Sequence, residues 1–475
     1  MKLNWFSPLA PARTDIAHYT SRVLEALASR AEVTLWTTQT HWDEKLNSYA
    51  KVRSYRLAKI PWAELNRGDM AIYHVGNEPK FHRSIWQISQ RHPGIVVLHD
   101  FCLQPLFASM YLAEWRDLDA YLTQMEFYYG KTGRQDAQEF YRRAIEGKAA
   151  LSIDKMAERY PLTMLALENA LGVVAHSRQV YERLRPELRC PLVYSGLPFP
   201  IQRKKGNARS KRGVPSPSPY RLIVFGYLGK NRRLDSLFES LAGLTEKEKF
   251  HLDVFGQVAD ERSVRRTIQA LGLKELVTLH GYVPDAKLDA ALEVAHLAIN
   301  LRFPTMGEAS GTQLRIWAHG LPSLVTETGW YETLPGDAVC FVRPFDEIAD
   351  IQKHLRAFLA HPERFAQMGE MGREILEKNH TPEQYARVIT NLAERARSYR
   401  PVAAIQAATM RSSIEMSAWL VSNENERDRL ELIRKKHSLI YGRTESNNRF
   451  LRAILRRAFR ISSWRRRLRG AYRER

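Results

Sequence analysis

The chain has 475 residues, 44% of them hydrophobic and 26% charged, and a formal net charge of +20. This length exceeds what one hydrophobic core supports, so we expect a soluble globular protein of two domains plus a tail. The sequence contains no run of 18 apolar residues, and residues 1–8 lack the apolar core of a signal peptide. We therefore expect no membrane-spanning helix and a cytoplasmic location.

The first 200 residues alternate predicted strands and helices. Apolar runs with the length of parallel strands lie at residues 2–7, 32–37, 70–75, 95–98 and 171–175. A stretch rich in Tyr, Met and Leu, residues 105–168, predicts a mostly helical insertion. Polar residues follow each of the last three runs. Because the carboxyl ends of parallel strands share one edge of a sheet, we expect these polar residues to face one cleft.

A second strand–helix alternation begins after residue 219. Residues 201–219 are rich in Lys, Arg, Ser and Pro, a composition that builds no core and predicts a linker. We therefore assign residues 1–200 to a first domain and 220–400 to a second, which a helix near residues 383–397 would close, and residues 401–475 to a tail. The predicted fold class is α/β, with two three-layer domains that face each other across a cleft.

Residues 297–327 have the pattern of a strand, a tight turn, a helix and a second strand. The turn carries Glu308, which is free to accept hydrogen bonds from sugar hydroxyls, and the helix begins after Ser310 and Gly311. A helix N-terminus preceded by small residues presents unpaired N–H groups and a positive dipole end, which suits a phosphate or diphosphate. An ordinary junction, in which Ser310 only caps the helix, is the alternative.

Two other groups of residues near strand ends have side chains suited to bind a ligand. Lys230, Arg232 and Arg233 come just before a helix, and guanidinium groups bind phosphate oxygens in a bidentate way. A solvated basic turn is the alternative there. His99 ends a buried strand, where it either contacts a substrate hydroxyl or bonds to a backbone carbonyl.

The sequence predicts no metal site. Cys102, Cys190 and Cys340 are far apart and have no metal-ligand spacing, which also predicts reduced thiols. Asp117 and Asp119 form a D-x-D pair, but they lie in a predicted helix, where carboxylates two residues apart point to different faces.

Five segments, in their order and spacing, resemble the family 4 retaining glycosyltransferases of the GT-B fold, in which two Rossmann-like domains face each other. They are FSPLAPARTDIAHY, VVLHDF, GVVAHS, FGYLGKNRRLD and PTMGEASGTQLRIWAHGLPSLVTETGW. The resemblance covers roughly residues 1–400 and is closest to bacterial enzymes that build O-antigen and other surface polysaccharides. It implies transfer of a hexose, with mannose from GDP-mannose favoured, to a growing and lipid-linked glycan, with a nucleotide-sugar as cosubstrate and no metal or further cofactor.

The resemblance also implies roles for individual residues. It places His99 at the sugar-transfer centre and Glu308 at the donor sugar, with Arg232 and Lys230 on the donor diphosphate. Catalytic roles then belong to His99, Glu308 and Arg232. The remaining residues that it implies are the phosphate-binding amides of the second domain and a first-domain loop beside the donor: Ser310, Gly311, Thr312, and Arg13, Thr14, Asp15.

Three positions depart from the family pattern. Ile316, preceded by Arg315, stands at the spacing of a second Glu that holds the nucleotide ribose, and Tyr227 replaces a first arginine. Asp15 replaces a glycine and adds a negative charge near the expected phosphates. These departures keep a second hypothesis open: a non-catalytic GT-B module that binds nucleotide-sugar or glycan and scaffolds a biosynthetic assembly.

The C-terminal tail holds about half of the excess positive charge. From residue 441 onward there are twelve arginines and two glutamates, a net charge of +10. Between residues 451 and 468 apolar side chains recur at helical spacing, a pattern typical of a helix on an anionic membrane surface, here the inner face of the cytoplasmic membrane. Docking to a partner protein is an alternative. A nucleic-acid partner is not expected, because the charge lies in one tail and is not interleaved with aromatic residues along a β-surface.

Deletion of residues 441–475 tests the membrane hypothesis. In sedimentation with anionic lipid vesicles, we expect the full chain to pellet with the vesicles and the truncated chain to remain in the supernatant, because the deleted arginines are attracted to anionic headgroups. Vesicles of neutral lipid serve as the control. Equal sedimentation of the two proteins with anionic vesicles would contradict the hypothesis.

Overall fold

The computed structural model describes residues 1–146, 153–201, 219–420, 432, 433 and 435. The predicted amphipathic helix after residue 449 and most of the predicted linker, residues 202–218, lie outside the described residues. Among the helices of the described segments, none combines the length and the apolar character needed to cross a lipid bilayer.

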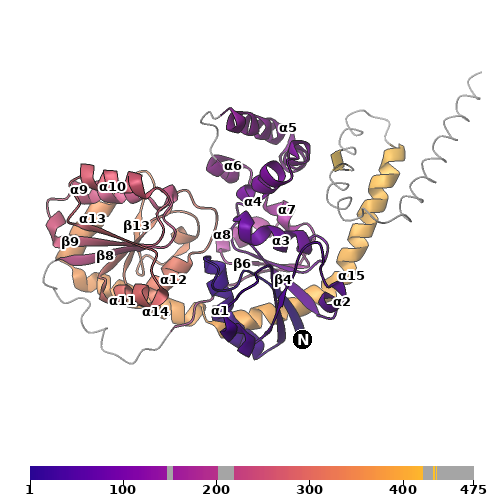
Figure 1. Ribbon diagram of the computed structural model, residues 1–475, viewed down its shortest axis with the longest axis horizontal. Coiled ribbons are helices and arrows are strands. Elements are labelled where there is room, and N and C mark those ends of the chain that lie inside the picture. The colour runs from indigo at the N-terminus through magenta and orange to yellow at the C-terminus, as the bar shows by residue number, and fades with distance from the viewer. Residues whose placement is uncertain (147–152, 202–218, 421–431, 434, 436–475) are drawn as a thin grey trace, which may run out of the picture.

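The first domain is built on a seven-stranded parallel sheet with the order β3-β2-β1-β4-β5-β6-β7 (Figure 1). Its strands are β1 (Lys2–Phe6), β2 (Glu32–Thr37), β3 (Lys51–Ser54), β4 (Met70–Val75), β5 (Ile95–Leu98), β6 (Gly172–Ala175) and β7 (Leu192–Tyr194). Alternate side chains enter two separate apolar clusters: Leu3 and Trp5 enter one, and Phe6 enters the other. The sheet is therefore covered on both faces, as its apolar strands predict.

Helices supply both covers of this sheet. They are α1 (Asp15–Ala28), α2 (Trp62–Leu65), α3 (Pro79–Ser89), α4 (Gln104–Ala108), α5 (Leu118–Ile145), α6 (Ile153–Arg159), α7 (Thr163–Leu167) and α8 (Arg178–Leu184), with short helical turns η1 (Glu44–Ser48) and η2 (Ser109–Glu114). The described part between β5 and β6 is mainly helical, and its long helix α5 bends at Gly130, where φ is 68°. On α1 the residues at helical spacing, Tyr19, Val23, Leu24 and Leu27, are buried.

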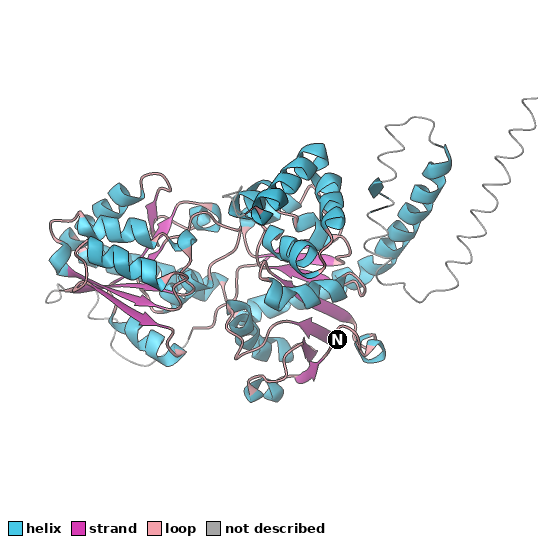
Figure 2. Cartoon of the chain, turned by 45° about the horizontal axis from the view of Figure 1, so that its top comes forward, coloured by secondary structure: helices cyan, strands magenta, loops and turns pink. Residues whose placement is uncertain are grey.

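The second domain has a six-stranded parallel sheet with the order β10-β9-β8-β11-β12-β13. Its strands are β8 (Tyr220–Phe225), β9 (Phe250–Phe255), β10 (Val277–Gly281), β11 (Leu297–Asn300), β12 (Ser323–Thr326) and β13 (Cys340–Val342). The helices between them are α9 (Leu234–Ala242), α10 (Glu261–Ala270), α11 (Asp285–Val294), α12 (Gly311–Ala318), α13 (Glu347–Ala360) and α14 (Pro362–Asn379), with short turns η4 (Lys230–Arg232), η5 (Lys247–Lys249) and η6 (Gly329–Thr333). Figure 2 shows the strands of each domain enclosed by helices. The prediction of two α/β domains with parallel sheets is confirmed.

The strand order reverses once in each sheet, between β1 and β4 in the first and between β8 and β11 in the second. At such a reversal the connections leave to opposite faces, which opens a crevice beyond the carboxyl ends of the strands, and ligands bind there. The segments that follow β1, β5, β8 and β11 carry the predicted site residues. The fold therefore places these segments where open α/β sheets bind ligands.

The helix expected to close the second domain packs on the first domain instead. Tyr385, Ile389 and Leu392 of α15 (Pro382–Leu420) share an apolar cluster with Leu3 and Trp5 of β1. Figure 1 shows α15 running along the first domain. The expectation was wrong because helical spacing identifies the apolar face of a helix but not the sheet which that face covers.

The chain crosses between the domains twice, and the two crossings are bonded to each other. The amide of Phe199 donates to the carbonyl of His380 at 2.8 Å, and Nδ1 of His380 lies 2.7 Å from the carbonyl oxygen of Leu197. These bonds fasten the return crossing to the outward one.

Candidate functional site

The carboxyl ends of the two sheets meet at a backbone contact. The carbonyl of Met306, in the turn after β11, accepts hydrogen bonds from the amides of Phe101 and Cys102, each at 2.9 Å. The side chain of Met306 packs against the apolar core of the first domain. A Cβ on Gly307 would lie only 2.5 Å from the Cβ of Phe101. The turn of the second domain is thus docked on the loop that follows β5.

Glu308 organises this turn from within. One carboxylate oxygen accepts hydrogen bonds from the amide of Met306 at 2.7 Å and from the hydroxyl of Thr305 at 3.0 Å. The other oxygen, Oε1, lies 3.0 Å from a guanidinium nitrogen of Arg302, without the alignment of a hydrogen bond. Oε1 of Glu308 and Nε of Arg302 are buried and make no hydrogen bond within the described segments. Buried polar atoms of this kind are rare and are available to a hydroxyl-bearing ligand.

Asp100 of the first domain experiences the charge of Glu308. It follows His99 directly, and its carboxylate accepts a hydrogen bond from the amide of Asn77 at 2.8 Å. Burial, with the negative charge of Glu308 as the second cause, raises the pKa of Asp100 to about 7. Two acidic groups from different domains therefore share one electrostatic environment, with Arg302 as a cation that acts on both.

His99 is half-buried and lies against a cluster of histidines, of which His74, His82 and His176 are buried. Its Nε2 lies 2.8 Å from Nδ1 of His74, whose own Nε2 is buried and has no hydrogen bond within the described part of the chain. A buried N–H without a partner is rarer than a buried acceptor without one, so we assign the proton of His74 to Nδ1. His99 then accepts at Nε2 and carries its proton at Nδ1. Burial, followed by the charges of His74, His176 and His82, lowers the pKa of His99, so the ring is neutral and Nδ1–H is a donor.

Arg232 is buried beneath the N-terminus of α12. Its guanidinium donates to Oδ1 of Asn300 at 2.8 Å, to the carbonyl of Phe225 at 3.1 Å and to the hydroxyl of Thr312 at 3.3 Å. Burial, and then the positive charge of Arg302, lowers its pKa to about 10. Arg232 ties the loop after β8 to β11 and α12, and it places a positive charge directly under the helix end.

The other basic residues of this loop differ from Arg232. Lys230 is exposed to solvent, whereas Arg233 forms an ion pair at 2.7 Å with the buried carboxylate of Glu347. The amide of Phe303 donates to the carbonyl of Asn231 at 2.8 Å, which holds the loop next to the turn after β11. Of the three basic residues noted in the sequence, Lys230 is therefore the one that presents its charge to solvent.

The N-terminus of α12 faces the N-terminus of α1. The hydroxyl of Ser310 caps α12 by accepting from the amide of Gln313 at 3.1 Å, which leaves the amides of Gly311 and Thr312 without a helical partner. A Cβ on Gly311 would lie 2.2 Å from Oδ2 of Asp15, so this carboxylate lies against the helix end. The departure noted at Asp15 thus places a negative charge where the sequence predicts a diphosphate.

The remaining predicted positions lie at the edges of this region. Arg13 stacks its guanidinium 4.7 Å from the centre of the Tyr282 ring, and Thr14 immediately precedes α1. Arg315 donates to Asp285 and to Asp289, each at 2.8 Å. Arg315 therefore takes part in an ion-pair network. Ile316, which stands at the spacing of the second Glu in the resemblance, is buried in the core of the second domain.

Three residues of this region were missing from the predicted site: Arg302, His74 and Asn300. Arg302 lies two residues beyond the end of β11, and a charged residue close to the end of a buried strand is a signal that the sequence did offer. His74 lies inside β4 among apolar residues, so its contact with His99 depends on the register of β4 beside β5. That register cannot be read from either strand alone.

No group of three or more His, Cys, Asp or Glu side chains is arranged to hold a metal ion among the residues described. Asp117 of the D-x-D pair caps α5 by accepting from the amide of Ala120 at 2.9 Å, and Asp119 lies 2.6 Å from Nζ of Lys435. Both carboxylates of this pair thus have partners in the protein.

Comparison with known sequences identifies a domain type. Residues 207–375 match the family described as Glycosyl transferases group 1. The chain is also similar to the mannosylfructose-phosphate synthase of Agrobacterium fabrum (strain C58), with 26% identity over 163 residues. That match covers 32% of this chain and spans about a third (35%) of the length of the relative. The match to the family model thus lies over the second domain.

Comparison with solved structures extends the likeness to both domains. Anabaena HepE in complex with UDP has a TM-score of 0.54 at 13% identity, covering 82% of this chain and 98% of that one. The sucrose-phosphate synthase of Thermosynechococcus elongatus has a TM-score of 0.55 at 16% identity, with coverages of 85% and 100%. WaaG, a glycosyltransferase involved in lipopolysaccharide biosynthesis, has a TM-score of 0.50 at 15% identity, with coverages of 82% and 100%. These TM-scores and coverages show a shared fold, two facing Rossmann-like domains as in GT-B.

Replacement of Gly307 by alanine tests the docking of the two domains. Gly307 has φ of 79°, and the added Cβ would meet the Cβ of Phe101. We expect Gly307→Ala to separate the turn from the first domain and to raise the radius of gyration measured by small-angle X-ray scattering.

Gly272→Ala is the matched control, because Gly272 has φ of 66° with nothing within 4 Å of an added Cβ. Both variants should lose about 1–2 kcal/mol of unfolding free energy from left-handed backbone strain. Only Gly307→Ala should become more open. An unchanged radius of gyration in Gly307→Ala would contradict the docking contact.

Proposed function

We propose that this chain is a glycosyltransferase that moves a hexose from a nucleotide-sugar to a glycan with retention at the anomeric carbon. One juxtaposition carries the proposal: the N-terminus of α12, to which Arg232 is bonded through Thr312, lies in the same interdomain region as Glu308 and His99. The loop that carries the exposed Lys230 is held beside the turn of Glu308. The glycosyltransferase group 1 match and the shared fold support it.

In the proposed chemistry the N-terminus of α12 stabilises the leaving group. As the bond between the anomeric carbon and the diphosphate breaks, negative charge accumulates on the leaving group, and the amides of Gly311 and Thr312, with Lys230 and Arg232, stabilise it. The acceptor oxygen attacks from the same face and forms the new glycosidic bond, and its proton passes to the departing phosphate oxygen. No carboxylate nucleophile and no metal ion take part in this scheme.

Glu308 and His99 then have positioning roles toward the donor sugar. Oε1 of Glu308, buried and without a hydrogen bond within the described segments, is suited to accept from a sugar hydroxyl. His99, neutral and protonated at Nδ1, is suited to donate to a sugar oxygen and not to act as a general base. One acceptor and one donor, supplied by different domains, would fix the sugar only when the domains are docked.

We further propose the finer identities that the sequence resemblance implies: family 4 membership, mannose as the hexose and a lipid-linked surface glycan as the acceptor. WaaG, a structural neighbour, takes part in lipopolysaccharide biosynthesis, which supports a surface-glycan acceptor. Donors with either nucleotide base are to be tested, because HepE is solved with UDP whereas the resemblance implies GDP-mannose. A lipid-linked acceptor would place the protein at the inner face of the cytoplasmic membrane through its tail.

Two observations favour a second candidate, the non-catalytic module that binds nucleotide-sugar or glycan. Asp15 lies against the helix end expected to bind the diphosphate, and Arg315 is engaged by Asp285 and Asp289 beside the place of a ribose-binding carboxylate. Both features weaken donor binding in electrostatic terms. Binding of a nucleotide-sugar without turnover would favour this candidate.

A panel of radiolabelled nucleotide-sugars, including GDP-mannose and UDP-glucose, tests the proposed activity on lipid-linked and free glycan acceptors with and without chelator. We expect transfer with one donor that persists with chelator. Glu308→Gln should lower kcat at least about a hundredfold, about 2.7 kcal/mol, because the side chain keeps its shape and loses its charge at the donor sugar. Unchanged affinity for the nucleoside diphosphate would show that the variant is folded. Near-normal turnover by Glu308→Gln would remove this carboxylate from the scheme.

Asp15→Asn tests the placement of the diphosphate. Removal of a negative charge beside the helix end should tighten binding of the nucleoside diphosphate, measured by calorimetry, by about fivefold, since charges roughly 5 Å apart in a solvated site interact by about 1 kcal/mol. Glu25→Gln, on the exposed face of the same helix, makes the same change of charge and should leave affinity unchanged. Equal affinities in all three proteins would place the diphosphate away from α12.

A further inference from the structure

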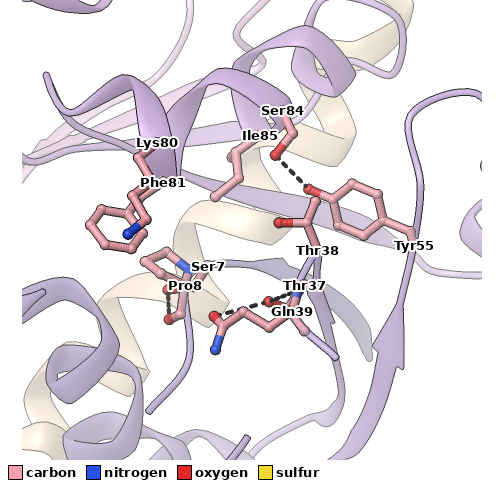
Figure 3. Close-up of a pocket in the computed structure, with 10 residues that line it drawn as sticks. All are labelled: Ser7, Pro8, Thr37, Thr38, Gln39, Tyr55, Lys80, Phe81, Ser84 and Ile85. Carbon is pink, nitrogen blue, oxygen red and sulfur yellow. Dashed lines mark hydrogen bonds between the residues drawn. The ribbon is translucent and has the colours of Figure 1, made fainter. Parts of the chain in front are cut away.

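The first domain contains a pocket that includes none of the predicted site residues (Figure 3). It opens at the carboxyl ends of β1 and β2 and beside α3, with a cavity volume of about 190 Å³. This is below the roughly 300–1,000 Å³ of pockets that enclose drug-sized ligands, so it suits one small unit and not a chain. Its lining residues are Ser7, Pro8, Thr37, Thr38, Gln39, Tyr55, Lys80, Phe81, Ser84 and Ile85.

The chemistry of the lining is that of a polyol site with one cation. Figure 3 shows Lys80 and Phe81 on one side of the hollow and Tyr55 with Ser84 on the other. The hydroxyl of Tyr55 donates to Ser84 at 3.3 Å, which leaves the Ser84 proton free for a ligand. Phe81 supplies an aromatic surface, and Thr38 is exposed and adds a further hydroxyl. Gln39, in contrast, is already engaged, since it bonds to both the amide and the carbonyl of Leu9.

Lys80 gives the pocket its charge. No carboxylate is among the ten lining residues, and the described part of the chain offers Lys80 no ion pair. Its ammonium lies 5.5 Å from the centre of the Phe81 ring. Glu78, the nearest acid in the sequence, accepts instead from the backbone amide of Lys80 at 3.3 Å and so caps α3. The pocket therefore carries a net positive charge that its own residues do not neutralise.

Helix α3 connects this pocket to the region of His99. Phe81, Ser84 and Ile85 of α3 line the pocket, while His82 of the same helix bonds through Nδ1 to the carbonyl of His74 at 3.0 Å. His74 in turn contacts His99. A ligand that reaches from the transfer centre across the ends of β4 and β1 would place a more distant unit in the pocket.

We propose that this pocket is a subsite for an anionic sugar unit of the acceptor, a sugar that carries a carboxylate or a phosphate. The ring would stack on Phe81, its hydroxyls would bond to Ser84 and Thr38, and its anionic group would pair with Lys80. The identification of this sugar as a unit of the acceptor rests on the proposed glycosyltransferase function. The pocket's preference for an anionic sugar is a binding property and is measured without turnover.

Saturation-transfer NMR titrations of the full chain with glucuronate, glucose 6-phosphate and glucose test the subsite. We expect the two anionic sugars to bind more tightly than glucose, and their rank to distinguish a carboxylate from a phosphate ligand. Lys80→Gln should weaken the preferred anionic sugar by about fivefold to tenfold, the effect of one charge-assisted hydrogen bond, and leave glucose unchanged. Lys80→Arg should restore most of the loss. Phe81→Ala should weaken all three sugars.

Lys353→Gln is the matched control, because Lys353 is an exposed helical lysine of the second domain and its loss removes the same charge. Three results would overturn the subsite: no preference for the anionic sugars in the unmodified protein, an affinity in Lys80→Gln equal to that of Lys353→Gln, or no effect of Phe81→Ala. Loss of transfer to every acceptor, with the Lys80-dependent preference intact, would contradict the proposed function and leave the anionic-sugar pocket standing.

Discussion

Two hydrogen bonds to one backbone carbonyl join the loop that follows β5 in the first domain to the turn that follows β11 in the second. The carbonyl of Met306 accepts from Phe101 and Cys102, and the neighbouring Gly307 leaves room for this approach. Because both bonds involve backbone atoms, the contact depends on the conformation of the turn more than on the identity of side chains. Glu308 fixes that conformation by accepting from the amide of Met306. One carboxylate therefore both shapes the interdomain contact and lies at the proposed donor sugar.

The buried charges of this region stabilise one another. An unpaired carboxylate or guanidinium is costly in a protein interior, and the cost falls when opposite charges and hydrogen bonds surround it. Arg302 pairs with Glu308 and its positive charge also acts on Asp100. Arg232 is satisfied by Asn300, Phe225 and Thr312. Separation of the domains would remove Asp100 from this group. The electrostatic character of the site thus belongs to the docked pair of domains and to neither domain alone.

Much of the fold could be predicted from local pattern. Apolar runs identified the central strands of both sheets, and the small residues around Gly311 identified the start of α12. The edge strands β3, β7 and β13 were missed because two are only partly buried and β7 and β13 have three residues each, too short for a periodic signal. The domain against which α15 packs is decided by tertiary contacts, which helical spacing does not encode.

The structure brings the loops after β5, β8 and β11 and the start of α1 together, yet the sequence did not specify the surroundings of the residues on them. It indicated three cations at Lys230, Arg232 and Arg233, but burial of one and pairing of another with Glu347 depend on residues more than 60 positions away. The contact of Asp15 with Gly311 likewise joins the two domains across nearly 300 residues. We propose that a nucleoside diphosphate binds at the N-terminus of α12 between the docked domains. A crystal structure of the full chain with UDP tests it most directly: we expect diphosphate oxygens to accept from the amides of Gly311 and Thr312, with Lys230 in reach and Asp15 displaced. A bound diphosphate located elsewhere, with Asp15 still against Gly311, would contradict the account.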